Sequence, residues 1–308
     1  MILTVTLNTA LDLTYRVPAL TPHASHRVTQ VIERPGGKGL NVARVLGALG
    51  HEAVATGFVG GPTGEVLRSR LAGLRVRDAL VPVAGSTRRT VAVVDTASGD
   101  TTQLNEPGPT ITPAEWSVLT GRYAQLLDGA SAVALCGSLP PGIHVGAYAE
   151  LVRMARSAGV PVLLDTSGEP LRRGIAARPD LVKPNAEELA ALTGSREPHR
   201  ATRDARRRGA HAVVSSLGPE GMLAATPEGL WRAAPPAAVK GSPTGAGDSA
   251  VAGLLSGLVD GLAWPERLTR AVALSAATVL SPVAGEFDRG AYEELLPRVT
   301  VTEQAAAA

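Results

Sequence analysis

The sequence predicts an α/β fold in which helices cover both faces of a mostly parallel β-sheet, as one major domain with a small excursion. Short apolar runs of strand length recur along the 308 residues, and helical spacing fills most segments between them, which is the pattern of such a sheet. Hydrophobic residues make up 44% of the chain but aromatic residues only 3%. The core must therefore consist of Ala, Val and Leu, which suits helices packed on a parallel sheet.

The expected strands of the main sheet are six buried runs. In chain order they are Ile2–Leu7, Ala53–Val59, Ala132–Cys136, Val160–Asp165, Leu181–Lys183 and Ala212–Leu217. Two stretches, Leu13–Glu33 and Thr87–Leu104, alternate instead with period two, and a hairpin turn is expected at Ser98-Gly99-Asp100. A thin sheet is only marginally stable alone, so we expect these stretches to cover the active site or to pair with another subunit. The tail Val301–Ala308 is expected to be disordered.

A glycine-rich helix start lies between the two excursions, at Gly36-Gly37-Lys38-Gly39. It is not a Walker A loop, because the earlier Gly and the Ser or Thr after Lys38 are missing. Lys38, Asn41 and Arg44 fall on one side of the expected helix. A solvated helix face would explain Arg44 alone, but the glycines beside Lys38 and Asn41 favour a site for a polyol and an anion.

Three further turns follow expected strands, at the carboxyl edge where open α/β sheets bind ligands. Ser138 could hydrogen-bond a substrate from the first turn, although it also fits a plain turn. Asn185 and Glu188 form a capping box that explains their spacing by itself, yet Glu188 could also hold the waters of a magnesium ion. The glycine turn 216–221 suits backbone approach to a nucleotide.

The turn Gly241–Gly247 leads directly into an apolar helix and predicts an anion site. The small residues let a ligand approach the backbone, and the first N–H groups of the helix point at it. Asp248 adds a base beside that anion site, which is what phosphoryl transfer to a hydroxyl requires. A common glycine-rich helix start is the structural alternative. Residues 245–250 also fit the dinucleotide fingerprint G-x-G-x-x-A, but the proline-rich segment 233–238 stands where its strand should be.

The composition excludes several classes of protein. The formal net charge of +2 gives no field that implies nucleic acid as a partner. One cysteine, Cys136, excludes an internal disulfide framework and fits a reducing compartment. Residues Met1–Leu7 resemble a strand more than a signal peptide, and no apolar run reaches membrane-spanning length. A soluble cytoplasmic protein is expected, with no membrane partner.

Five motifs spread over nearly the whole chain resemble, in the same order, the ribokinase-like (PfkB) sugar kinases. They are residues 36–44, 137–142, 183–188, 216–221 and 245–248. Residues 6–15, Lys38 and residues 104–109 are similar to the branch of 1-phosphofructokinases and tagatose-6-phosphate kinases. The resemblance implies a single three-layer α/β/α sandwich over residues 1–308, with a small β-sheet lid made of about 13–33 and 87–104.

The resemblance also implies a role for each matching residue. Asp248 would take the proton from the acceptor hydroxyl, while the N–H groups of Gly245, Ala246 and Gly247 would hold the moving phosphoryl group. The implied substrate residues are Asp12, Gly37, Asn41 and Ser138 for the sugar, and Lys38, Arg27 and Arg88 for its phosphate, with Arg89 beside Arg88 as an alternative. The implied nucleotide residues are Lys183, Asn185, Ser216, Gly218 and Gly221 for ATP, with Glu188 holding Mg²⁺ through water.

The expected reaction is phosphorylation of a ketohexose phosphate by ATP, with fructose 1-phosphate giving fructose 1,6-bisphosphate as the first choice. Tagatose 6-phosphate and fructose 6-phosphate are the alternatives within the family. A dinucleotide-dependent oxidoreductase and a sugar-phosphate sensor without chemistry are the alternatives from other classes. A homodimer through the lid is the expected assembly, because a thin half-exposed sheet invites pairing.

Overall fold

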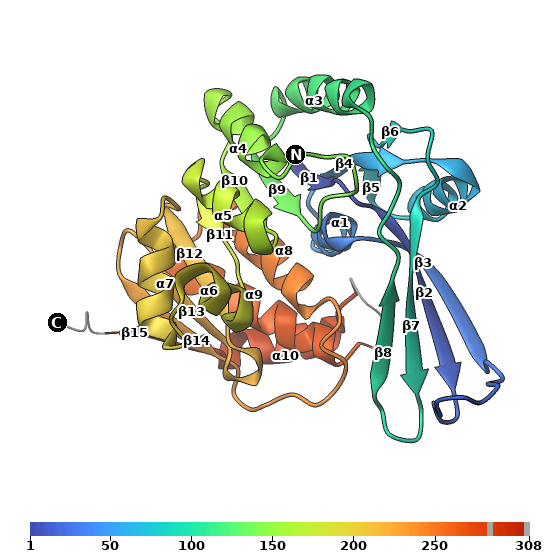
Figure 1. The fold of residues 1–308 in the computed structure, drawn as a ribbon. Coiled ribbons are helices and arrows are strands. Elements are labelled where there is room, and N and C mark those ends of the chain that lie inside the picture. The colour runs from blue at the N-terminus through green and yellow to red at the C-terminus, as the bar shows by residue number, and fades with distance from the viewer. Residues whose placement is uncertain (282–285, 305–308) are drawn as a thin grey trace.

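The computed structural model of the chain describes residues 1–281 and 286–304, which form one large and one small β-sheet (Figure 1). The large sheet has 11 strands and carries helices on both faces, so the expected architecture is confirmed. Strand β1 (Ile2–Thr6) lies in its middle and pairs in parallel with β4 (Ala53–Val59) and β9 (Ala132–Cys136). Beyond β9 the parallel part continues through β10 (Val162–Asp165), β11 (Leu181–Val182) and β12 (Ala212–Ser216). Each of the six expected runs thus forms a strand.

The two edges of the large sheet differ from the sequence-based expectation. Short strands β5 (Val76–Asp78) and β6 (Val81–Pro82) extend it beside β4. At the other edge, β13 (Met222–Ala225), β14 (Leu230–Ala234) and β15 (Thr300–Gln304) run antiparallel. Disorder in the tail was therefore a wrong prediction for residues 301–304, whose backbone pairs with β14, while 305–308 lie outside the described residues.

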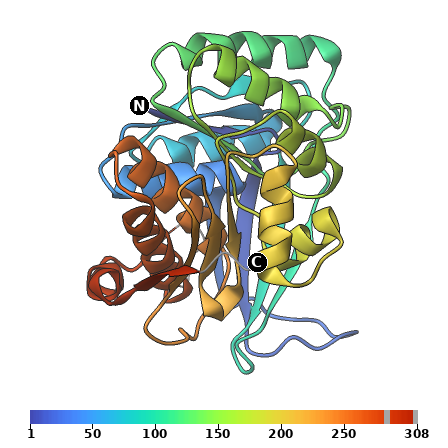
Figure 2. The same ribbon diagram turned by 90° about the vertical axis from the view of Figure 1, so that its left-hand side faces the viewer.

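Alternate side chains of the central strands face opposite helix layers. In β1, Ile2 packs into one layer, while Leu3 and Val5 pack into the other. The first layer contains α1 (Lys38–Ala48), α2 (Gly61–Leu71), α8 (Ala246–Val259) and α9 (Trp264–Val279), with α10 (Arg289–Leu295) packed on α9. The second contains α3 (Pro113–Leu127), α4 (Ala147–Ser157), α5 (Gly168–Ala176), α6 (Ala186–Thr193) and α7 (Pro198–Arg207). Figure 2 shows the two layers on either side of the sheet.

The small sheet stands off the main body and has the order β3-β2-β7-β8. Its strands are β2 (Ala10–Val17), β3 (Gln30–Gly36), β7 (Arg88–Asp95) and β8 (Thr101–Asn105). The hairpin turn between β7 and β8 spans residues 96–100, which include the expected residues 98–100. Residues 18–29 form a loop instead of the extended structure expected there.

Each strand of the small sheet presents its residues alternately to two faces. Asp12, Thr90 and Asn105 are paired across neighbouring strands and share one face. Leu13, Val91 and Leu104 are one residue away on the same strands, so they share the other face. The small sheet is therefore polar at this level on one face and apolar on the other. Among the described residues, no helix has both the length and the apolar composition needed to cross a bilayer.

Candidate active site

A cleft of about 700 Å³ lies between the two sheets, at the carboxyl ends of the central strands. The chain changes direction in the sheet at β1, since β4 lies on one side of this strand and β9 on the other. Parallel sheets bind ligands at such a switch point. The sequence-predicted residues that line the cleft are Asp12, Gly37, Lys38, Asn41, Arg88, Lys183, Asn185, Glu188, Ser216, Gly218, Gly245, Gly247 and Asp248.

Helix α8 begins at the cleft with unpaired amides. Gly245 precedes the helix with a φ of 83°, in the left-handed region that favours glycine. Among the described residues, the N–H groups of Gly245, Gly247 and Asp248 have no hydrogen-bond partner. The N–H of Ala246, which the sequence predicts to act with them, instead donates to the Pro243 carbonyl oxygen at 3.1 Å in this structure. The free donors of this anion hole are thus residues 245, 247 and 248.

The carboxylate of Asp248 lies on the first turn of α8 and is 7% exposed. The Asn41 side-chain amide donates to Asp248 Oδ2 at 2.8 Å, and Arg44 in turn donates to Asn41 Oδ1 at 2.8 Å. Burial raises the pKa of Asp248 to about 6, although the charges of Lys38 and Lys183 oppose this rise. A carboxylate with that pKa is ionised at neutral pH and is still a useful proton acceptor.

A buried carboxylate missed from the sequence, Asp165, lies between the two lysines of the cleft. Lys38 Nζ donates to Asp165 Oδ1 at 3.2 Å, and Lys183 Nζ is 3.7 Å from Oδ2. Asp165 raises the pKa of Lys38 above its usual value, so this lysine stays charged. The signal for Asp165 was its position at the end of an expected buried strand.

The polar face of the small sheet supplies the opposite wall of the cleft. Thr90 Oγ1 donates to Asp12 Oδ1 at 2.5 Å, because β2 and β7 pair in parallel with these two residues in register. Thr90, Gln103 and Asn105 line the cleft and were also missed. Their positions depend on strand register, which the sequence does not specify.

Adjacent arginines in β7 point to opposite sides of the strand. Arg88 lines the cleft and donates from Nε to the Asn8 carbonyl at 3.3 Å and from Nη1 to the Glu106 carbonyl at 3.1 Å. Arg89 donates to the Glu106 carboxylate instead and does not line the cleft. Of the two, Arg88 is the one positioned to meet a ligand.

Three other predicted residues lie outside the cleft lining. Ser138 lines an adjoining hollow that Arg88 and Asn105 also line, and it accepts a hydrogen bond from Asn8 Nδ2 at 3.2 Å. Gly221 closes the turn before β13, where its carbonyl accepts from Leu217 N at 2.8 Å. Arg27 is exposed in the loop 18–29 of the small sheet.

The remaining lining comes from the start of α6 and the end of β12. Asn185 and Glu188 form the expected capping box, with reciprocal hydrogen bonds of 2.8 and 2.9 Å. Within residues 1–281 and 286–304 no group of three or more His, Cys, Asp or Glu side chains is arranged to hold a metal ion. A cation here would depend on few carboxylates and many waters, as Mg²⁺ does.

Comparison with known proteins gives a consistent result across the chain. Residues 4–288 match the pfkB family carbohydrate kinases. A 1-phosphofructokinase from Rhodobacter capsulatus is 40% identical over 91% of this chain and 92% of its own length. A tagatose-6-phosphate kinase from Staphylococcus epidermidis is 30% identical over 98% of this chain and its entire length.

The same likeness holds for a solved structure. Phosphofructokinase-2 from Escherichia coli, in complex with potassium, superposes with a TM-score of 0.90 at 32% identity. The match covers 96% of this chain and 98% of the other. The large mostly parallel sheet and the separate small sheet are thus features of a fold shared with these kinases.

Proposed function

We propose that this chain, which belongs to the pfkB family of carbohydrate kinases, transfers the γ-phosphoryl group of ATP to fructose 1-phosphate and forms fructose 1,6-bisphosphate. The chain is a phosphotransferase with an alcohol acceptor and acts on a ketohexose phosphate. The observation that supports the mechanism is the ionisable Asp248 beside the free amides of residues 245 and 247. An anion hole and a base at one point are what transfer to a hydroxyl needs.

The reaction proceeds by in-line displacement at the γ-phosphorus. Asp248 accepts the proton of the sugar hydroxyl as the oxygen bonds to phosphorus, and the bond to the β,γ-bridging oxygen breaks, which releases ADP. The N–H groups of Gly245, Gly247 and Asp248 stabilise the charge on the equatorial oxygens. Asn41, fixed by Arg44, holds the Asp248 carboxylate in position.

Lys183, Asn185, Ser216 and Gly218 form the ATP side of the cleft. Asp165 Oδ2 is buried and receives no hydrogen bond, and Glu188 lines the cleft nearby, so both carboxylates fit a hydrated Mg²⁺ bound with the nucleotide. Bound Mg²⁺ supplies charge neutralisation on the phosphate oxygens. Gly221 contacts ATP only if the turn 216–221 shifts, since its backbone is engaged in that turn.

Asp12, Gly37 and Asn41 bind sugar hydroxyls, while Lys38 and Arg88 bind the phosphate that the sugar already carries. Ser138 lies close to the sugar, in the adjoining hollow that shares Arg88 with the cleft. Arg27 remains a candidate for the same phosphate. The chain is a single ribokinase-like unit over 1–308, and its small sheet is a lid that excludes water when it closes. A cytoplasmic location is supported by the single cysteine, Cys136, which is buried and unpaired.

The choice of sugar is tested by comparing kcat/KM for fructose 1-phosphate, tagatose 6-phosphate and fructose 6-phosphate with ATP and Mg²⁺. We expect the first to exceed the others at least tenfold. If kcat/KM is highest for tagatose 6-phosphate, the chain is a tagatose-6-phosphate kinase instead. No ADP release with any of the three would make the chain a sensor, and a fluorescence change with NADPH would favour an oxidoreductase.

The pH profile of kcat/KM should fall on the acid side with a midpoint near pH 6, because burial raises the pKa of Asp248 to about 6. Below that pH the carboxyl is protonated and no longer accepts the hydroxyl proton, so the rate should drop about tenfold per pH unit. Phosphate monoesters lose their second proton in the same range. The residual activity of Asp248→Asn is therefore the control. Its pH profile should keep the fall in kcat/KM caused by protonation of the substrate phosphate and lose the fall caused by protonation of Asp248.

Dimerisation through the lid uses the apolar face of the small sheet, where Val31 is 55% exposed and Leu104 59% exposed. Replacing both with Lys should convert a dimer into a monomer, because like charges then meet in an apolar interface. Light scattering after size exclusion measures the mass. Val118→Lys is the control, since this valine on α3 is 59% exposed but lies on the main body. A monomeric wild-type at micromolar concentration would contradict the proposal.

A further inference from the structure

A second cavity, of about 880 Å³, opens at the opposite edge of the large sheet, where the active-site residues do not reach. Its floor is formed by the loops before β11 and β12, and its rim by the β13–β14 turn and the end of β15. The volume falls in the range of cavities that hold small molecules. Neither the fold nor the proposed reaction requires an opening there.

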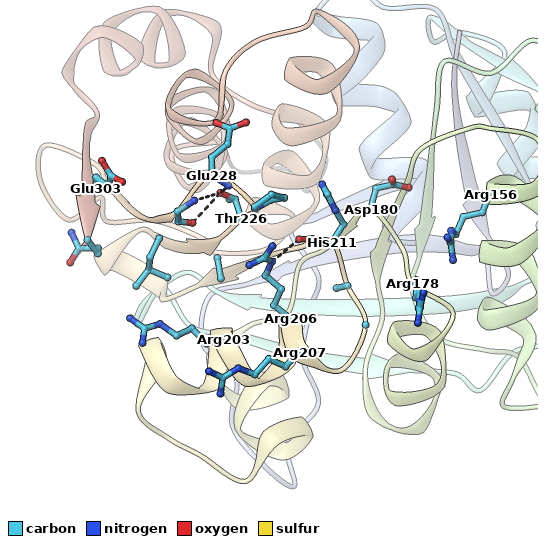
Figure 3. A pocket seen from close by; sticks show the side chains of 17 residues that line it. Arg156, Arg178, Asp180, Arg203, Arg206, Arg207, His211, Thr226, Glu228 and Glu303 are labelled. Atoms are coloured by element: carbon cyan, nitrogen blue, oxygen red, sulfur yellow. Dashed lines mark hydrogen bonds between the residues drawn. The ribbon is translucent and has the colours of Figure 1, made fainter. Parts of the chain in front are cut away.

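Arginines dominate the lining of this far cavity. They come from the ends of three helices: Arg156 from α4, Arg178 after α5, and Arg203, Arg206 and Arg207 from α7. Figure 3 shows Arg156 and Arg178 on one side and the three α7 arginines on the other, with His211 between them.

Carboxylates do not balance this positive charge, because the five arginines line the far cavity with only three acidic residues. Asp180 is engaged by the Val162 N–H at 2.8 Å. Glu228 and Glu303 belong to the rim. The arginine side of the cavity therefore carries an excess of positive charge.

Helix ends explain part of this charge. The carboxyl end of a helix carries a partial negative charge, and arginines commonly offset it. Arg156 donates to the Ala177 carbonyl at 3.1 Å, Arg206 to the His211 carbonyl at 2.8 Å, and Arg207 pairs with Asp204 at 3.3 Å. Each of these contacts uses a fraction of the five N–H donors that a guanidinium offers, so donors remain for a ligand.

The end of α5 explains the backbone of Arg178, because this residue follows the C-cap Ala177 and its N–H donates to the Ile175 carbonyl oxygen at 2.9 Å. Its φ is 63°, in the left-handed region, and the only other non-glycine residue with a positive φ in the described part of the chain is His23. Within that part, the Arg178 side chain makes no hydrogen bond or ion pair. Glycine is the usual residue at such a helix end, so the change Arg178→Gly keeps the backbone conformation. Arg156 donates a hydrogen bond to the carbonyl oxygen of Ala177, the residue before Arg178, so these two arginines are neighbours.

We propose that the far cavity binds a small polyanion that carries two or more phosphate groups. Guanidinium groups pair with phosphate oxygens in a bidentate fashion, and arginines on two sides of the cavity suit a ligand with separated phosphates. The far cavity lies at the opposite strand ends from the active site and shares no lining residue with it, so a ligand there would not contact the residues of the proposed reaction.

The test uses inorganic tripolyphosphate, which has neither a base nor a sugar, and isothermal titration calorimetry to count its sites. The variant Arg178→Gly with Arg207→Ala removes two arginines of the far cavity, and Gly suits the backbone at 178, so the fold is kept. We expect the wild-type to show a site that this variant loses or binds at least tenfold more weakly. The affinity of that site should also fall as salt is raised.

The matched control is Arg172→Ala with Arg208→Ala. These arginines are exposed on the same two elements and remove the same charge, but neither lines the far cavity. The control should bind tripolyphosphate like the wild-type. The proposal is overturned if the wild-type binds none, if the cavity variant binds as the wild-type does, or if both variants lose the same affinity, since that would show an unspecific charge effect.

Discussion

Replacing Asp248 with Asn is expected to lower kcat about 10²–10⁴-fold, the usual contribution of a general base. The amide has nearly the same shape, so it still accepts the hydrogen bond that Asn41 donates to Oδ2. It does not accept the hydroxyl proton. In the proposed mechanism ATP lies against the free amides of α8, which the substitution leaves in place, so the dissociation constant of ATP should change less than threefold. Single-turnover kinetics and ATP titration measure the two quantities.

The same substitution should make the protein more stable at neutral pH, which separates lost chemistry from lost folding. The pKa of Asp248 is raised in the folded state to about 6 from 3.8, so the folded protein binds the proton more tightly than the unfolded chain. Its contribution to stability is present at low pH and is lost as pH rises through about 6, a cost of about 3 kcal/mol at pH 8.

Asp248→Asn removes that cost, and urea unfolding measures the difference. The gain over the wild-type should be largest at pH 8 and shrink to roughly half at pH 5, because part of the wild-type is then already protonated. Asp248→Asn with more than a tenth of wild-type turnover would refute the assignment of the base. A variant that is less stable at pH 8 would instead refute the buried, ionised carboxylate.

Replacing Arg88 with Met is expected to lower kcat/KM for the phosphosugar about 10²–10³-fold. Truncating one partner of a buried charged hydrogen bond typically costs about 2–5 kcal/mol, and each 1.4 kcal/mol is tenfold. The loss should appear chiefly in KM, because the phosphate on the sugar keeps its charge during the reaction. Steady-state kinetics with saturating ATP measure this.

Arg89→Met is the matched control, since Arg89 is the next residue of β7 and pairs with Glu106 outside the cleft. It should change kcat/KM less than threefold. Free fructose, which has no phosphate, provides a second control, because its slow turnover should be the same in both variants. If Arg89→Met is the more damaging change, or if free fructose suffers equally from Arg88→Met, Arg88 does not bind the phosphate.

The sequence was sufficient for the features that repeat or follow chain order. Six buried strands, the two excursions and the turn before α8 are local patterns, and the carboxyl-edge rule gathered Lys183, Asn185 and Ser216 at one site. Features that depend on register could not be found in this way. The Asp12 and Thr90 side chains meet only because β2 and β7 pair in parallel 78 residues apart.

Two details of the site could not be predicted from the sequence: which of Arg88 and Arg89 faces the cleft, and whether the N–H of Ala246 is already hydrogen-bonded. Alternation shows that one of Arg88 and Arg89 faces the cleft, but the choice requires the position of the strand on the main body. The sequence suggests that the N–H of Ala246 is available to a ligand, yet in the structure it donates to the Pro243 carbonyl oxygen within a turn. Strand β15 was missed although Thr300, Val301 and Thr302 are β-branched residues that favour strands, because the run is short and its pairing with β14 is not visible in the sequence.

Asp248 belongs to the main body, whereas Asp12 and Arg88 belong to the small sheet, so a phosphosugar bound as proposed would contact both parts of the molecule. Only a molecule long enough to contact the small sheet and the main body at once would place its hydroxyl oxygen in line with the Asp248 carboxylate. A water molecule is too small to contact both parts of the protein and would not be held in that position. On this proposal the enzyme would limit ATP hydrolysis because only an acceptor long enough to make both contacts is positioned for transfer. No group that distinguishes a sugar hydroxyl from water would be needed.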